Sequence, residues 1–124
     1  MEQTDLRSER LAAVEDLLRF AIPLEMSARR LMTFPWDYVG VGVSFHAGHV
    51  ISVLQRVLDG TISVDQVEEW ANMIECREDV DISGGPEGWT GRTLHELANP
   101  PLFGAFSCER AKVLLAEPGA VGGT

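Results

Sequence analysis

The sequence lacks the features of disulfide-rich, zinc-binding, nucleotide-binding and membrane-spanning proteins. Its two cysteines, Cys76 and Cys108, match no zinc-site spacing. We expect both to be reduced thiols; a disulfide between them is the alternative. No apolar run approaches the ~20 residues of a membrane-spanning helix. The glycine-rich stretch 84–88 lacks the Lys-Ser/Thr ending of a phosphate-binding loop. The sequence therefore predicts no metal and no cofactor.

Positive charge is also scarce. The chain has 10 basic and 19 acidic residues, and its net charge is −9. Residues 59–96 contain ten acids but only two arginines, so this segment alone carries −8. Such a field repels nucleic acid and anionic membranes and favours a protein partner with a basic surface. The alternative is that the charge serves only solubility.

The size and the N-terminus indicate a single cytoplasmic domain. A chain of 124 residues is long enough for one hydrophobic core. The N-terminal residues 1–5 are acidic and no apolar run follows them, so we expect no secretory signal. We predict one helical domain over residues 1–116 and a flexible tail over residues 117–124.

The segment 53–81 specifies a helical hairpin. Gly60 follows an apolar helical face, where a helix needs a left-handed C-terminal residue. Ser63 and Gln66 have the spacing of a capping box, and Ile62 and Val67 that of a hydrophobic staple. Apolar residues, with Trp70 among them, then recur at helical spacing. The pattern predicts a helix from Val64 to about residue 78, with Trp70 at the centre of the core.

The remaining apolar patterns predict further helices, and together they indicate an all-α fold. Because the apolar register continues past Pro23, we interpret residues 5–32 as one helix with a kink at this proline. We expect Ser44 to cap a helix that ends at Asp59, and Thr93, or Thr90 one turn earlier, to begin a helix ending by Asn99. Ser107 should cap a last helix over residues 108–116. The expected fold is a compact bundle of about five helices around the central capped hairpin.

The loop Thr33–Val43 is unusually rich in apolar and aromatic residues, Trp36 and Tyr38 among them. It either folds back onto the core as a lid or forms an exposed binding patch, which would mark an interface. A short β-segment over residues 38–43 would have no evident partner strand.

The outer face of the helix after Ser63 is the predicted partner-binding surface. Its acidic side chains stand opposite the apolar residues at helical spacing. The residues that we assign to partner binding are Asp65, Glu68, Glu69, Glu75 and Asp79, with Trp36 and Tyr38 from the preceding loop. Structural roles are assigned to Trp70, Arg77 and Glu78, because Arg77 could stack on Trp70 and pair with nearby carboxylates.

The candidate catalytic and metal-binding residues give weak patterns. His46 and His49 are three residues apart and have no third ligand in the same motif. On a helix from Ser44, His46 would lie at the edge of the apolar face and His49 on the outer side. Paired carboxylates, Glu75 with Glu78 or Glu78 with Asp79, show no division into a buried acid and a solvated base. The sequence therefore predicts no catalytic residues.

The segment from Leu54 to Leu102 resembles small, acidic, all-helical bacterial proteins of unassigned biochemistry. The resemblance rests on three stretches of the sequence: LDGTIS at 58–63, WANMIECREDV at 70–80 and LHELANP at 94–100. It implies a cytoplasmic helical protein. Some similar proteins act as immunity proteins, which neutralise a toxin domain. The resemblance implies no catalytic residues.

Three functions remain as hypotheses. The first is a protein-binding protein, such as an immunity protein or inhibitor, whose acidic face engages a basic partner. The second is a helical metal-binding protein or metalloenzyme that uses His46 and His49. The third is a homodimeric adaptor joined through the Phe34–Val43 loop.

Overall fold

The computed structural model describes residues 2–35 and 37–121, and this part of the chain is mainly helical. It contains eight helices and a two-stranded sheet, rather than about five helices. The elements in chain order are α1 (Glu2–Leu18), α2 (Leu24–Leu31), β1 (Val43–Phe45), α3 (Ala47–Leu58), α4 (Val64–Glu75), β2 (Val80–Ile82), α5 (Trp89–Ala98), α6 (Pro100–Phe103), α7 (Cys108–Leu115) and α8 (Pro118–Val121).

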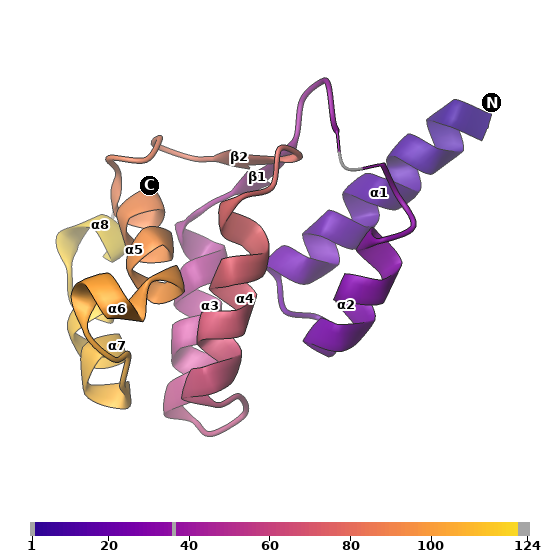
Figure 1. The fold of residues 1–124 in the computed structure, drawn as a ribbon. Helices are drawn as coiled ribbons and strands as arrows, with labels where there is room; N and C mark the ends of the chain where they lie inside the picture. Colours follow the sequence, from indigo (N-terminus) through magenta and orange to yellow (C-terminus); the bar gives the residue numbers. More distant parts are fainter. Residues whose placement is uncertain (1, 36, 122–124) are drawn as a thin grey trace.

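The hairpin of α3 and α4 lies in the middle of the molecule (Figure 1). The helices α1 and α2 pack together on one side of it, and α5 to α8 cover the other side. The short sheet lies across the end of the hairpin opposite the α3–α4 turn. None of the helices in the described ranges combines the length and the apolar character needed to cross a membrane.

The turn between α3 and α4 forms as the sequence predicts. Gly60 has φ = 84°, and the amides of Gly60 and Thr61 donate to the carbonyls of Val57 and Arg56. These two bonds close a Schellman motif, which satisfies the last carbonyls of α3. The Ser63 hydroxyl accepts from the Gln66 amide at 3.2 Å, and the Gln66 side chain accepts from the Ser63 amide at 2.8 Å. The predicted capping box is therefore confirmed.

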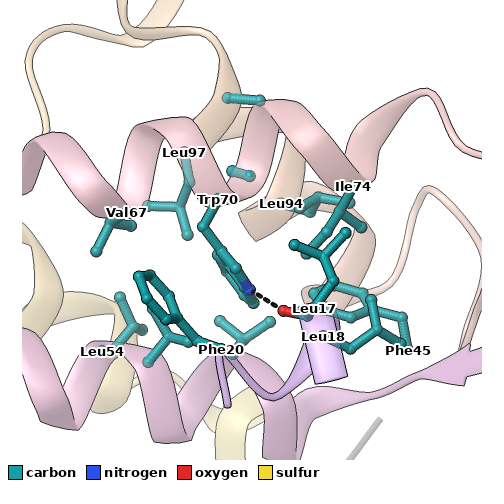
Figure 2. Packing of buried hydrophobic residues seen from close by; sticks show 14 of the residues in the cluster. Leu17, Leu18, Phe20, Phe45, Leu54, Val67, Trp70, Ile74, Leu94 and Leu97 are labelled. Carbon is teal, nitrogen blue, oxygen red and sulfur yellow. Dashed lines mark hydrogen bonds between the residues drawn. The ribbon is translucent and has the colours of Figure 1, made fainter. Parts of the chain in front are cut away.

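Trp70 lies at the centre of the core, as predicted. Its side chain is fully buried among aliphatic residues of α1, α3 and α5, with Phe45 beside it (Figure 2). The indole nitrogen donates to the Leu17 carbonyl at 2.8 Å. Because a buried indole N–H needs an acceptor, this bond fixes α4 against the C-terminal end of α1.

The first helix breaks, and the prediction of a kink at Pro23 is wrong. α1 ends at Leu18, and Phe20 adopts φ = 51°, which is rare for a residue with a side chain. The amides of Phe20 and Ala21 donate to Leu17 and Asp16, so Phe20 takes the place that glycine usually has in a Schellman motif. The burial of the Phe20 ring offsets the strain. Pro23 then stands just before α2.

The cap of α3 is His46 rather than Ser44. Ser44 lies in β1, which pairs in parallel with β2 in the register Val43 to Val80. The His46 ring accepts from the Gly48 amide at 3.1 Å, and the His49 ring accepts from the His46 amide at 3.1 Å. The two rings thus form a histidine version of a capping box.

The C-terminal region folds back onto α5. α5 begins at Trp89, one turn before the predicted Thr93 cap, and ends at the predicted place. Ser107 caps α7 as predicted. Residues 118–121, where we expected a flexible tail, form α8: Ala120 is buried and the Trp89 indole donates to Glu117 at 2.9 Å. A β-carbon on Gly119 would lie 2.3 Å from Cβ of Trp89. Only glycine permits this close approach.

Candidate functional site

The outer face of α4 carries the predicted acidic surface. Val67, Trp70, Ala71 and Ile74 are buried, and the helical period places Asp65, Glu68 and Glu69 on the opposite side. Asp65 and Glu69 are exposed, and Glu68 is half-buried. Together with Asn72 and Met73 these three acids line a shallow hollow of about 480 Å³. We call this surface the acidic hollow.

The carboxylates of the acidic hollow form no ion pair with the residues that the structure describes. The ion pairs between described residues include Glu15, Asp16, Glu75, Asp79, Glu96 and Glu109. None of the ion pairs found in that part of the chain involves Asp65, Glu68 or Glu69. The hollow is therefore a concentrated source of negative potential at the surface.

Glu75 faces α5 instead of the acidic hollow. Its carboxylate lies 2.6 Å from Nδ1 of His95 and accepts from the Asn99 side chain at 3.1 Å. The expectation that Glu75 belongs to the outer acidic face is wrong, because this residue at the end of α4 joins α4 to α5.

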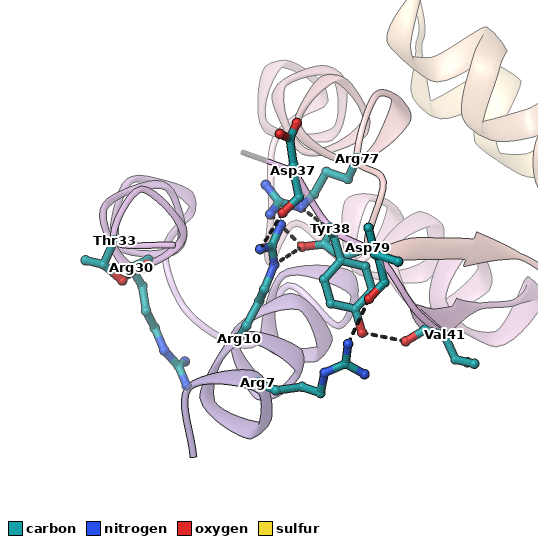
Figure 3. A network of polar contacts seen from close by, with 10 residues as sticks. Arg7, Arg10, Arg30, Thr33, Asp37, Tyr38, Val41, Arg77 and Asp79 are labelled. Carbon is teal, nitrogen blue, oxygen red and sulfur yellow. Dashed lines mark hydrogen bonds and ion pairs between the residues drawn. The ribbon is translucent and has the colours of Figure 1, made fainter. Parts of the chain in front are cut away.

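Asp79 is buried, so its assignment to the partner-binding surface is wrong. Its side chain is 0% exposed and lies between two arginines (Figure 3). Nε of Arg10 donates to it at 2.9 Å, and Arg77 donates through Nε and Nη2 at 2.8 and 2.9 Å. Burial raises the pKa of Asp79, but the hydrogen bonds and charges of Arg77 and Arg10 outweigh burial and lower it overall. We call these three residues the ion cluster.

Arg77 and Glu78 differ in the structure from the roles expected from the sequence. α4 ends at Glu75, earlier than expected, so Arg77 lies beyond the helix and binds Asp79 instead of stacking on Trp70. Its structural role is retained through a different contact. Glu78 is exposed, and nothing in its position indicates the structural role that we expected.

The ion cluster holds the segment 37–43 onto α1. Arg10 donates to the Asp37 carbonyl at 3.2 Å, and its guanidinium lies 4.8 Å from the centre of the Tyr38 ring. The Tyr38 hydroxyl donates to the Val41 carbonyl at 2.7 Å, so this half-buried tyrosine serves the loop itself. Trp36 lies outside the described residues. Val39 and Val41, in contrast, are 86% and 79% exposed.

An apolar cleft lies between α2 and α4, next to the ion cluster. Its volume is about 450 Å³. Its walls are Ala28 and Leu31 of α2, Met32, Phe34 and Pro35 after α2, Asn72 and Met73 of α4, and Cys76 directly after α4; Arg10, Arg77 and Glu78 complete the lining. Asn72 and Met73 also line the acidic hollow, so the cleft and the hollow adjoin each other along α4. We call the two together the α4 groove.

His46 and His49 are occupied by the local structure. His49 is buried, not on the outer side, and its Nε2 lies 3.0 Å from Glu15, while Nδ1 caps α3. His46 is exposed, and its ring stacks on that of His49 at 4.0 Å between centroids. Within the described ranges, no group of three or more His, Cys, Asp or Glu side chains has the geometry to hold a metal ion.

In each of the two carboxylate pairs considered from the sequence, one member is bound by other side chains. In the pair Glu78 and Asp79, Asp79 is held ionised by two arginines, which disfavours proton transfer. In the pair Glu75 and Glu78, Glu75 binds His95 and Asn99. Cys76 and Cys108 are both free and exposed.

Comparison of the chain with protein-family models, curated proteins and solved structures gave no match. The function is therefore argued from the α4 groove itself.

Arg10 and the cleft are not evident from the local spacing of residues in the sequence. Arg10 lies 69 positions from Asp79 and in a different helix, so no local spacing connects them. One signal was present: Arg10 stands four residues before the buried Val14, on the side of α1 that faces the core, where an arginine needs a partner.

We predict that Asp79→Asn lowers the free energy of unfolding by about 3–5 kcal/mol, because it leaves two arginines, one of them buried, without their carboxylate. Asp16→Asn is the matched control, since Asp16 pairs with Arg30 at the surface, and should cost less than about 1 kcal/mol. Urea unfolding monitored by tryptophan fluorescence measures both. Equal losses in the two variants would contradict a stabilising ion cluster.

Because the pKa of His49 is lowered in the folded protein, we predict that the protein loses stability at mildly acidic pH. Burial lowers its pKa below the ordinary 6.5, and the hydrogen bond to Glu15, which raises it, only partly opposes burial. Below pH 6.5 the unfolded chain therefore binds a proton that the folded chain does not. Stability should fall as the pH is lowered from 6.5 to the folded pKa, by at most about 1.4 kcal/mol per pH unit.

Urea unfolding of the wild type and His49→Gln between pH 7.5 and 5.5 checks this. Glu15, whose pKa is lowered from 4.5, stays ionised throughout this range and adds no slope. His49→Gln should show a flatter dependence on pH. The same slope in both proteins would mean that His49 does not titrate as we argue.

Proposed function

We propose that this protein is a protein-binding protein whose acidic face engages a basic partner, in the manner of an immunity protein or a small inhibitor. One observation carries the proposal: Asp65, Glu68 and Glu69 line one solvent-facing hollow on a rigid helix and have no ion-pair partner among the described residues. Other acids, such as Glu15 and Glu96, are paired with a basic side chain.

The mechanism follows from charge and rigidity. The negative potential of the acidic hollow attracts a basic surface and accelerates encounter. α4 is held in place by the buried Trp70 and by the packing of α5, so its carboxylates keep their spacing in the unbound protein. Contact with such a surface would then cover the partner's basic active or binding residues.

The test compares two double charge reversals. Glu68→Lys with Glu69→Lys should reduce capture of a basic protein from a lysate of the source cells, and slow its association about tenfold or more at low salt. Glu9→Lys with Glu87→Lys is the matched control, because both residues are exposed and the net charge changes equally. Capture is read by mass spectrometry, and association by stopped-flow fluorescence at several salt concentrations. Equal capture and equal rates in both variants would refute the proposal.

The second candidate is a homodimeric adaptor joined through the Phe34–Val43 loop. The observation that favours it is the exposure of Val39 and Val41 at 86% and 79%. Water-exposed valines side by side on a loop are typical of a contact surface.

For the adaptor, sedimentation should show a wild-type dimer at tens of micromolar and a monomer for Val39→Ser with Val41→Ser, because the double variant removes the apolar contact. Val113→Ser, at an exposed valine of α7, is the control. A wild type that stays monomeric over this range would exclude this candidate.

A further inference from the structure

The α4 groove has two chemically different ends. At one end the walls are apolar, and Met32 is 82% exposed although it lines the cleft. At the other end are the three carboxylates of the acidic hollow. Asn72 and Met73 belong to both ends, so a single bound segment can contact both.

The spacing of the occupant's residues follows from the distance along α4 between Met73, where the cleft and the hollow meet, and the carboxylates of the hollow. A helix rises 1.5 Å per residue, so Met73 lies about 6 Å along α4 from Glu69 and about 12 Å from Asp65. An extended segment advances about 3.3 Å per residue and would cover this distance in two to four residues. A helical segment would need four to eight.

The acidic hollow sets the direction. The charges at the cleft end balance, because Arg10 and Arg77 are offset by Asp79 and by Glu78, which also lines the cleft. Basic residues are therefore attracted to the acidic hollow rather than to the cleft. Met32 and Met73, on opposite walls, are flexible and can adapt to an apolar side chain of varied shape.

We propose that the α4 groove binds a segment of the partner protein that carries one large apolar residue, which enters the cleft, followed or preceded at this spacing by Lys or Arg residues, which contact Asp65, Glu68 and Glu69. This inference rests on the proposed function and names the recognised segment. The apolar residue slows dissociation of the complex. The basic residues fix the orientation of the bound segment and speed its association.

The experiment selects random 12-residue displayed peptides for binding to the whole protein. The expected peptides contain a large apolar residue and a Lys or Arg residue. The two are two to four positions apart if the peptide binds in an extended conformation, and four to eight positions apart if it binds as a helix. Enrichment of acidic peptides, drawn to Arg10 and Arg77, would overturn the proposal. So would enrichment of peptides without basic residues, or no enrichment.

Two sets of variants then locate the bound peptide. Met32→Asp, at a residue that is 82% exposed, and Met73→Asp, at a residue partly packed against the core, should each weaken a selected peptide at least tenfold. Glu68→Lys with Glu69→Lys should do the same, and Glu9→Lys with Glu87→Lys should not. If only the Glu68→Lys with Glu69→Lys variant loses peptide binding, the proposed function stands but binding in the cleft is refuted. If only the Met32→Asp and Met73→Asp variants lose peptide binding, the role of the acidic face is refuted.

The two cysteines provide an internal control. Cys76 lines the cleft, whereas Cys108 lies in the first turn of α7, and both thiols are exposed. A selected peptide should slow alkylation of Cys76 by iodoacetamide at least fivefold and leave Cys108 unchanged. Unchanged alkylation of Cys76 in the saturated complex would overturn binding in the cleft.

Discussion

The buried carboxylate of Asp79 is the point at which four parts of the chain meet. Arg10 reaches it from α1, and Arg77 reaches it from the end of α4. The backbone of Asp79 leads into β2, and its carbonyl accepts from the Val43 amide at the start of β1. A buried carboxylate without these arginines would be costly, and so would the buried Arg10 without the carboxylate. The three charges therefore require one another, and together they define one end of the α4 groove.

A second buried contact completes the placement of α1. The Trp70 indole binds the Leu17 carbonyl near the C-terminal end of α1, and Arg10 holds the middle of the same helix. α1 is thus fixed at two points against α4 and its extension. α2 packs on α1 and also contacts α4, so both helices that border the cleft are packed against other parts of the fold. A preformed groove avoids part of the ordering cost of binding.

The local elements that could be predicted are those whose determinants are close in sequence. The capping box of Ser63 and Gln66, the glycine turn at Gly60, the Ser107 cap and the burial of Trp70 depend on residues within a few positions of one another. The break after Leu18 was missed because its cause is tertiary. A phenylalanine takes a left-handed conformation there while its ring enters the core and Arg56 binds its carbonyl at 3.0 Å.

The sequence by itself determined a mainly helical domain, its central hairpin, and an acidic stripe at Asp65, Glu68 and Glu69, because helical periodicity alone places these residues opposite the apolar face. Only the tertiary structure decided that Asp79 is buried, that Glu75 faces α5, that β1 pairs with β2, and that an apolar cleft adjoins the acidic hollow. Each of these depends on a contact between residues twenty or more positions apart, and no spacing along the chain encodes which distant side chain will satisfy a buried charge.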